Sequence, residues 1–177
     1  MGVNVGVVSK CNIWRMDILI LVTLGTNDKT FVRLIKEVEK LIQEGVITEE
    51  VVIQAGYTKY QSDKMEIFDL IPMEKFEELI SNCRLLITHG GVGSIITGLK
   101  NSKKVIAVPR LEKYGEHVND HQLQIIRNFK NAGYILGVSD VEELRSAIEM
   151  VVSFQPKTYE SNTARMVELV RELIERD

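Results

Sequence analysis

Residues 85–100 read LLITHGGVGSIITGLK, an apolar segment that passes through a glycine-rich turn into a second apolar segment. Residues 85–88 have the length and composition of a buried strand, and residues 94–100 are predicted to be a helix. A strand that leads directly into a helix is the repeating unit of a parallel sheet. This stretch therefore favours a fold in which helices cover a parallel sheet.

The same succession of strand and helix recurs along the chain. Because the strands are apolar throughout, both faces of the sheet are expected to be covered. The sequence thus predicts an α/β fold of the doubly wound, Rossmann-like kind, whose ligands bind beyond the carboxyl ends of the strands, near the point where strand order reverses. Strands are predicted at residues 18–24, 51–54, 67–71, 85–88, 105–108 and 134–136, and helices over residues 31–42, 76–80, 94–100, 119–129 and 141–151.

Length and composition fit one domain of this kind. The chain has 177 residues, of which 45% are hydrophobic, and a formal net charge of −3. This charge argues against a nucleic-acid-binding protein, which usually carries a basic excess on one face. The two cysteines, Cys11 and Cys83, are too few for a disulfide framework and point to a reducing compartment. The longest apolar run, residues 18–22, is far shorter than the ~18 residues of a membrane span.

Three segments are predicted along the chain. Residues 1–15 lack the long apolar region of a signal peptide, and we expect them to be an extension ahead of a domain that begins at Met16. A short strand at residues 3–8 is the alternative. The domain is expected to span residues 16–155. Residues 156–177 are expected to form a final helix whose apolar stripe packs either on this domain or on a partner subunit.

The turn that contains Gly90, Gly91, Gly93 and Ser94 is the main candidate for a ligand site. Glycines let the backbone approach a ligand closely, and the helix that follows presents unpaired N–H groups with a partial positive charge. This combination suits a diphosphate, with the Ser94 hydroxyl as a further donor. An ordinary strand-to-helix turn is the alternative.

Two familiar phosphate motifs do not fit this turn. Leu99 and Lys100 stand where a P-loop has Lys followed by Ser or Thr. Ile96 stands where a dinucleotide fingerprint has its third glycine. Glu112 does lie roughly twenty residues further on, as a ribose-binding acid would, so a dehydrogenase stays open as an alternative.

Two other segments follow predicted strands and are expected at the same edge of the sheet. Gly25 and Thr26 end the first strand, where they either approach the ligand from the opposite side or form an ordinary turn before a helix. The polar segment KYGEHVNDHQ, residues 113–122, follows the strand at 105–108, and its carboxylates and amides suit sugar hydroxyls. The alternative for this segment is structural, with Asp120 capping a helix.

The same segment contains two of the three histidines. His117 and His121 are four residues apart, so on a helix they would share a face and could bind zinc. The metalloprotease signature has Glu at the second position, where this chain has Val118. A zinc-dependent hydrolase therefore remains only as an alternative.

In their order and spacing, these segments resemble a known family. VTLGT at residues 22–26, THGGVGS at 88–94, and VPR at 108–110 followed by GEHVNDHQ at 115–122 carry the resemblance. They are similar to the C-terminal, donor-binding half of GT-B glycosyltransferases of family 28, and especially to its small Alg13-like members with their PssE- and EpsF-like exopolysaccharide relatives. The resemblance covers about residues 16–175. It implies an inverting hexosyltransferase with a UDP-sugar as co-substrate and no cofactor or essential metal.

The resemblance also implies roles for individual residues. The diphosphate would be held by Gly90, Gly91, Gly93 and Ser94, with His89 beside them and with Gly25 and Thr26 on the opposing loop. The uracil would contact the backbone around Pro72 and Met73, and the donor sugar would contact Asp120 and Gln122, just after Glu116 and His117. His117 is the local candidate for the general base.

One position departs from the family pattern. Many donor domains of this type have Glu at the position of Thr97, where it holds the ribose hydroxyls. Thr97 cannot bind a diol in that way, so the ribose must be bound by another group or more weakly. This favours the polysaccharide branch of the family.

The resemblance further implies half of an enzyme, because a complete GT-B protein has two Rossmann-like domains. The other half is expected to be a membrane-anchored, Alg14-like (PssD- or EpsE-like) subunit that presents a lipid-linked sugar. This chain is then expected in the cytoplasm, recruited to the inner face of the membrane through that subunit. A non-catalytic subunit that binds nucleotide sugar or enhances another transferase is the alternative.

Overall fold

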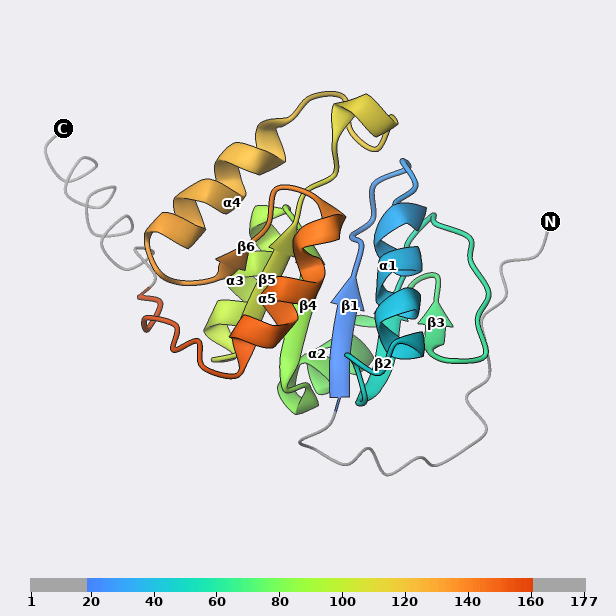
Figure 1. Ribbon diagram of the computed structural model, residues 1–177, viewed down its shortest axis with the longest axis horizontal. Coiled ribbons are helices and arrows are strands. Elements are labelled where there is room, and N and C mark those ends of the chain that lie inside the picture. Colours follow the sequence, from blue (N-terminus) through green and yellow to red (C-terminus); the bar gives the residue numbers. More distant parts are fainter. Residues whose placement is uncertain (1–18, 161–177) are drawn as a thin grey trace, which may run out of the picture.

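Six parallel strands form one sheet in the order β3-β2-β1-β4-β5-β6 (Figure 1). The computed structural model describes residues 19–160, so the expected extension at 1–15, its boundary at Met16 and most of the expected final helix lie outside the described residues. The strands are β1 (Leu19–Thr23), β2 (Glu50–Gln54), β3 (Glu66–Phe68), β4 (Leu85–His89), β5 (Lys104–Val108) and β6 (Leu136–Gly137).

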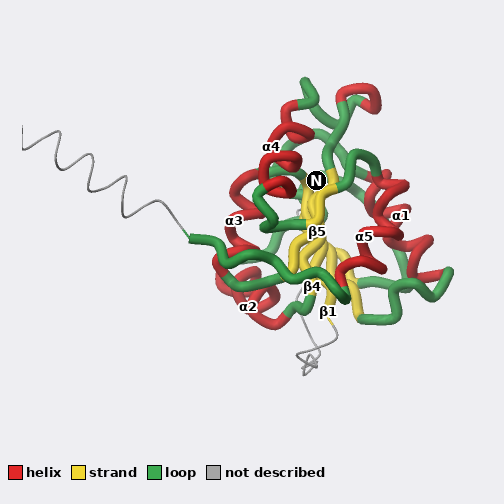
Figure 2. Tube along the Cα trace, turned by 60° about the vertical axis from the view of Figure 1, so that its left-hand side comes forward, coloured by secondary structure: helices red, strands yellow, loops and turns green. Residues whose placement is uncertain are grey.

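Helices cover both faces of the sheet, as Figure 2 shows. α1 (Val32–Gln43) and α5 (Leu144–Val151) pack on one face. α2 (Met73–Asn82), α3 (Val92–Lys100) and α4 (His121–Asn131) pack on the other. Two short 3₁₀ turns, η1 (Glu112–Tyr114) and η2 (Val141–Glu143), precede α4 and α5. The predicted doubly wound α/β fold is confirmed.

The alternation of β1 explains why its first four residues are all apolar. Leu19 and Leu21 belong to the core beneath α2, α3 and α4, whereas Ile20 and Val22 belong to the core beneath α1 and α5. All four side chains are fully buried. Successive side chains of a strand point to opposite faces, so a strand covered on both faces has no polar position to spare.

The edge strands differ from the sequence-based prediction. The strand expected at 67–71 ends at Phe68, because Asp69 leaves the sheet and accepts a main-chain hydrogen bond from Gly56 (2.7 Å). The strand expected at 134–136 begins only at Leu136. Tyr134 instead packs edge-on against Phe129 and Tyr159, with ring centroids 6.5 and 5.5 Å away. This aromatic packing keeps Tyr134 out of the sheet, so β6 is shorter than the predicted strand.

The order of the strands positions the site. β1 and β4 are neighbours at the centre of the sheet, with Thr23 paired to Thr88. The chain leaves β1 toward α1 on one face and leaves β4 toward α3 on the other. The two loops therefore separate above the carboxyl ends of these strands, which is the switch point where doubly wound folds bind ligands.

Residues 156–160 return across the domain, where the Lys157 N–H donates to the carbonyl of Gly133 (3.0 Å). Among residues 19–160, no helix combines the length and the apolar character that crossing a bilayer requires.

Candidate functional site

The loops after β1 and β4 meet around the imidazole of His89. A Cβ atom at Gly25 would lie 2.5 Å from His89 Cε1, and one at Gly91 would lie 2.4 Å from His89 Nε2. Both distances are shorter than real Cβ contacts, so neither position accepts a side chain without displacing the ring. Gly25 also has a φ of 74°, a left-handed conformation that favours glycine. The structure therefore brings the predicted residues Gly25, His89 and Gly91 together.

His89 is neutral at pH 7. Burial and, after it, the positive charge of Arg110 lower its pKa to about 4. Nδ1 lies 3.4 Å from the carbonyl oxygen of Thr23. That neighbour favours the tautomer with the proton on Nδ1, which makes Nε2 an acceptor.

α3 begins with unpaired N–H groups. Gly91 is its N-cap, and no side chain caps the helix. Ile95 is the residue whose N–H returns to the carbonyl of Gly91 (3.2 Å), so the N–H groups of Val92, Gly93 and Ser94 precede the helical ladder. The position of a Cβ at Gly93 is open space. This turn presents three main-chain donors at the positive end of a helix, which suits an anion.

Other residues of the predicted diphosphate site have different surroundings. A Cβ at Gly90 would lie 2.7 Å from Gln122 Cβ, so this glycine lets α4 pack closely on the turn. Ser94 is half-buried, and its hydroxyl has no hydrogen-bond partner in the described part of the chain. Thr26 is exposed at the opposing loop. The Thr97 hydroxyl donates to the carbonyl of Gly93 (2.8 Å), so it is used within α3.

The predicted uracil segment lies beyond β3. Pro72 is the N-cap of α2 and Met73 is its first residue, with the Met73 side chain 69% exposed. Leu70 and Tyr57, from neighbouring loops, are also more than half exposed. Apolar side chains thus gather at the carboxyl ends of β2 and β3, where a flat base could lie on them.

Gln54 connects the loop after β3 to the loop after β1 at the centre of the site. Its Nε2 donates to the carbonyls of Gly25 (3.1 Å) and Asp69 (3.3 Å), and its Oε1 accepts from the Thr23 hydroxyl (3.0 Å). Gln54 is 6% exposed. One buried amide therefore fixes the loop after β1 relative to the loop after β3.

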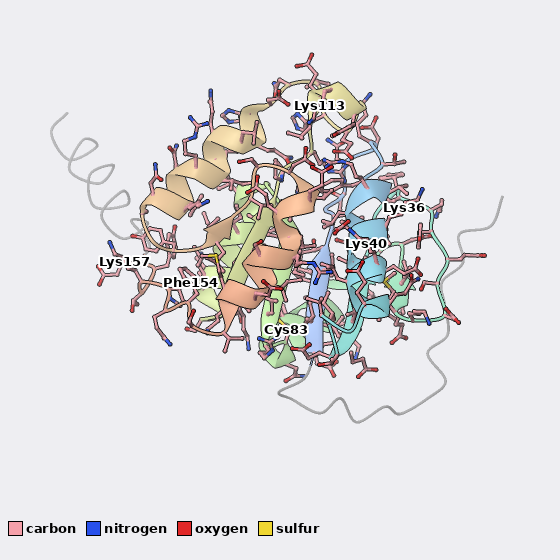
Figure 3. The ribbon with its side chains drawn as sticks, viewed as in Figure 1. Lys36, Lys40, Cys83, Lys113, Phe154 and Lys157 are labelled. Atoms are coloured by element: carbon pink, nitrogen blue, oxygen red, sulfur yellow. The ribbon has the colours of Figure 1, made fainter. Side chains whose placement is uncertain are left out.

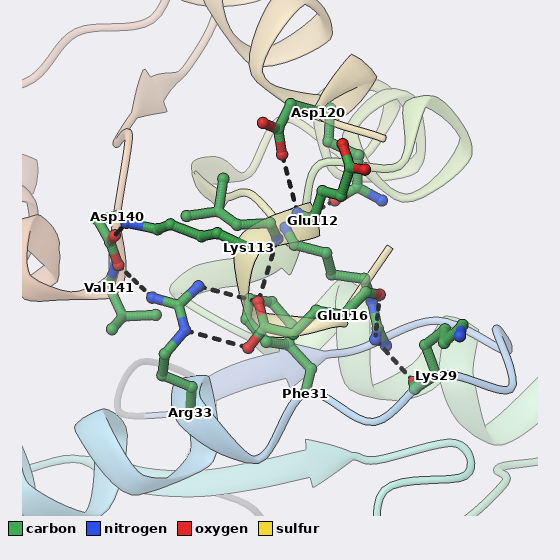
Figure 4. Close-up of polar contacts among 12 residues, drawn as sticks. Lys29, Phe31, Arg33, Glu112, Lys113, Glu116, Asp120, Asp140 and Val141 are labelled. Atoms are coloured by element: carbon green, nitrogen blue, oxygen red, sulfur yellow. Dashed lines mark hydrogen bonds and ion pairs between the residues drawn. The ribbon is translucent and has the colours of Figure 1, made fainter. Parts of the chain in front are cut away.

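At the start of α4, Gln122 and Asp120 are placed differently from each other. Gln122 Oε1 accepts from the backbone N–H of Arg110 (2.9 Å), which identifies the oxygen of this amide and leaves its nitrogen as an available donor. Asp120 is exposed, and its Oδ1 accepts from the Glu112 N–H (2.9 Å), as Figure 4 shows. Asp120 occupies the N-cap position of α4, but its side chain makes no capping hydrogen bond.

The alternative of a zinc site on one helical face does not fit, because α4 begins at His121 and His117 lies in the preceding loop. His117 Nδ1 lies 3.0 Å from the carbonyl of Asn119, whereas His121 Nδ1 lies 3.3 Å from Gln124 Oε1. Within residues 19–160, no three or more His, Cys, Asp or Glu side chains are grouped so that they could hold a metal ion.

Glu116 is directed into an ion-pair network and not toward a ligand. Its carboxylate accepts from Arg33 Nε (3.0 Å) and Nη2 (2.9 Å) and from the Leu111 N–H (3.1 Å). Figure 4 shows Arg33 between Glu116 and Asp140, which also binds Lys113 Nζ (3.0 Å). Glu116 is 6% exposed. The structure gives this predicted sugar-binding residue a structural partner on α1.

Arg110 is the largest fully buried side chain among the described residues, at 1% exposed. Its Nη2 donates to the carbonyl of Leu24 (2.8 Å) and its Nη1 to the carbonyl of Lys29 (2.7 Å). The guanidinium also lies over the ring of Phe31, 5.1 Å from the centroid. Arg110 therefore ties the start of the β5–α4 connection to the loop after β1.

The thiol of Cys83 lies at the opposite end of the molecule from Lys113 (Figure 3). Burial raises the pKa of Cys83 to about 11, so the thiol stays protonated at neutral pH. It takes no part in the site above the switch point.

Comparison with known families identifies the domain. The model of the glycosyltransferase family 28 C-terminal domain matches residues 19–176. The chain belongs to this family. No curated protein sequence matches this glycosyltransferase domain.

Solved structures share the fold of the domain at low sequence identity. The UDP-GlcNAc 2-epimerase of Methanocaldococcus jannaschii, in complex with UDP-GlcNAc and UDP, is 16% identical with a TM-score of 0.62 over 90% of this chain and 45% of its own. The glycosyltransferase of kitacinnamycin is 18% identical with a TM-score of 0.57, over 76% of this chain and 34% of its own. The solution structure of ALG13 is 18% identical with a TM-score of 0.56, over 87% of this chain and 94% of its own. The glycosyltransferase domain thus spans about a third of the kitacinnamycin enzyme but nearly all of ALG13.

Two residues of this glycosyltransferase domain were missed as site residues by the sequence analysis. Arg110 is part of the VPR motif and Gln54 ends a predicted strand, and neither is predicted from the sequence to belong to the site. A polar residue at the last position of an otherwise apolar strand was the available signal for Gln54. Arg110 follows a proline directly after a strand, at the edge where ligands bind, which was the corresponding signal.

Proposed function

We propose that this chain is the donor-binding, catalytic subunit of an inverting glycosyltransferase that uses a UDP-sugar. The observation that carries the proposal is the uncapped start of α3 at the switch point, with Gly93 open to solvent and the Gly25 loop in contact with His89. Main-chain donors at a helix N-terminus suit the diphosphate of a nucleotide sugar. Family membership supports the same reaction class.

In the proposed mechanism, the N–H groups of Val92, Gly93 and Ser94 bind the diphosphate. An acceptor hydroxyl attacks the anomeric carbon, the new C–O bond forms, and the bond to the β-phosphate oxygen breaks. The charge that develops on the departing UDP is stabilised by these donors and by the helix dipole, so no metal is required. The proton of the acceptor passes to a general base, which is either a group on the partner or, on this chain, His117.

The donor sugar and the uracil would be bound on opposite sides of the diphosphate. The free Nε2 of Gln122 and the second carboxylate oxygen of Asp120 offer one donor and one acceptor to sugar hydroxyls. The uracil would lie near Met73, against the exposed apolar side chains and main chain of that loop. UDP as the nucleotide draws support from the epimerase, whose structure contains UDP-GlcNAc and UDP.

We further propose that the acceptor half is a separate subunit. The chain covers 34% of the kitacinnamycin glycosyltransferase, against 94% of ALG13. The partner proposed is membrane-anchored and Alg14-like (PssD- or EpsE-like), and it presents a lipid-linked sugar in exopolysaccharide or glycolipid synthesis. The chain would then be cytoplasmic and be recruited to the inner face of the membrane through that partner.

Calorimetric titration of the purified chain with UDP and with UDP-sugars, with and without a chelator, tests the donor site. The sharpest variant is Gly93→Asp, because a side chain there meets open space and a carboxylate in the first turn suits the helix. We expect this variant to stay folded and to lose UDP binding through charge repulsion. Asn128→Asp, an exposed site on α4, is the charge-matched control and should bind as the wild type does.

Two results would contradict the proposal. If neither the chain nor its complex with the partner binds any UDP-sugar, the donor site is absent. If UDP binds but turnover of the complex is unaffected by Gly93→Asp, the chain is a non-catalytic subunit that binds or enhances.

A further inference from the structure

We infer that Arg110 is a positioning residue for the donor: its buried guanidinium and its backbone N–H together hold the Gly25 loop beside the start of α4, and its charge is positive at the diphosphate site. The inference rests on the proposed function. It concerns a residue that touches the loops of the site and not the donor itself.

The hydrogen bonds of Arg110 join three segments of the site. Its backbone N–H donates to Gln122 Oε1 at the start of α4 (2.9 Å). Its guanidinium donates to Leu24, the residue before Gly25, and to Lys29 at the end of the same loop. A longer contact of 3.5 Å reaches the carbonyl of Glu116. Arg110 therefore links the loop after β1 to α4 through its side chain and its backbone together.

The charge of Arg110 has no ion-pair partner in the part of the chain that the structure describes. Its guanidinium contacts only carbonyl oxygens and the face of Phe31, and its Nε is buried without a hydrogen bond. The negative charges of Glu116 and Asp28 act on Arg110 from a distance, but burial outweighs them and lowers its pKa. Both oxygens of Glu116 bind Arg33. A buried and unpaired cation is costly unless something compensates it. A bound diphosphate would provide the opposite charge.

The field of Arg110 reaches the centre of the site. Its charge is, after burial, the main reason that the pKa of His89 is low. His117 acts weakly in the same direction, and the carbonyl of Thr23 acts against it. Since His89 lies between Gly25 and Gly91, a charge that acts on its ring also acts on an anion bound at that turn.

The test compares Arg110→Met, which removes the charge, and Arg110→Lys, which keeps it but loses the fork that binds two carbonyls. Arg127→Met, at an exposed position on α4, is the matched control. Three quantities are measured: UDP affinity by calorimetry, the melting temperature, and the pKa of His89 from the NMR titration of its Cε1–H signal, assigned with His89→Gln.

We expect Arg110→Met to weaken UDP binding by about tenfold or more, as loss of one nearby charge implies. The pKa of His89 should rise in this variant and stay low in Arg110→Lys, which should bind UDP with intermediate affinity. The control should match the wild type. A merely structural role would lower the melting temperature without separating the two variants in the His89 titration.

A folded Arg110→Met that binds UDP as tightly as the wild type overturns the inference. If that variant does not fold, Arg110→Lys decides: wild-type affinity overturns the inference, and weaker binding at an unchanged His89 pKa supports the positioning role. Absence of UDP binding by the wild type is a different result, because it removes the proposed function itself.

Discussion

His89 and Gly91 share one space: the imidazole occupies the volume that a Cβ at residue 91 would need, with Nε2 only 2.4 Å from that position. Gly91 has a φ of −79°, which any residue adopts, so the contact with the ring is the reason for glycine here. We expect Gly91→Ala to lower the free energy of unfolding by about 1–3 kcal/mol through overpacking.

The companion variant His89→Ala removes the ring and should relieve this clash. In a double-mutant cycle measured by urea unfolding, we expect a coupling of about 1 kcal/mol or more between Gly91→Ala and His89→Ala. Additive effects of the two changes would show that the ring and the glycine do not compete for this space.

The low pKa of His89 predicts how stability depends on pH. The ordinary value of 6.5 applies in the unfolded chain and about 4 in the folded one, so the unfolded state binds more protons between these values. The contribution of His89 to stability is therefore complete above pH 6.5 and is lost as the pH falls toward 4, by about 3 kcal/mol at most. Denaturant unfolding at several pH values measures it.

For this pH dependence, His89→Gln is the informative variant and His121→Gln the control, since His121 is exposed. The first should flatten the decline of stability between pH 6.5 and 4, and the second should leave it as in the wild type. An unchanged decline in His89→Gln would assign the effect to other groups.

Removal of the Thr97 hydroxyl is expected to leave the affinity for the donor unchanged. This hydroxyl donates within α3 to the carbonyl of Gly93 and is not available to ribose. Thr97→Val should therefore bind UDP within about twofold of the wild type, a difference below 0.5 kcal/mol. Calorimetry of the two proteins side by side checks this, and a loss of tenfold would place the Thr97 hydroxyl on the nucleotide.

For Glu116 we expect the opposite: a substitution there should affect the stability of the domain more than its binding of the donor. The Glu116 carboxylate accepts hydrogen bonds from Nε and Nη2 of Arg33 and is nearly buried. Glu116→Gln should therefore lower the free energy of unfolding by about 1–3 kcal/mol. Thermal and urea unfolding measure the loss. Arg33→Met in the Glu116→Gln background should add a further loss, because it also removes the contacts of Arg33 with Asp140 and with the ring of Tyr114. If Glu116→Gln is as stable as the wild type and fails to bind a UDP-sugar, the carboxylate belongs to the donor site instead.

The sequence was sufficient to predict the central part of the fold. β1, β4 and β5 are apolar on both faces, and the glycine turn after β4 marks where α3 begins. The edges were harder, because β3 and β6 are two to three residues long and are ended by the packing of other residues, such as Tyr134 against Tyr159. Local patterns carry no information about such contacts.

The site was predicted in part for the same reason. Gly25, His89 and Gly91 lie next to strands whose order could be expected, and they do converge. Arg110 and Gln54 act through hydrogen bonds to the loop after β1, 29 to 86 residues away in sequence, which no local spacing reveals. The helix predicted at 119–129 is α4, which begins two residues later at His121, since the exact start of a helix is the least certain feature of a sequence pattern.

The open start of α3 has a consequence for how such a domain can change over evolution. Every residue except proline has a backbone N–H group, so an anion site made from such groups survives most substitutions at positions 92 to 94. The groups offered by Asp120 and Gln122 are encoded side chains and can be exchanged one codon at a time. Specificity for the sugar is thus free to diverge among related proteins, while the main-chain site for the diphosphate is retained.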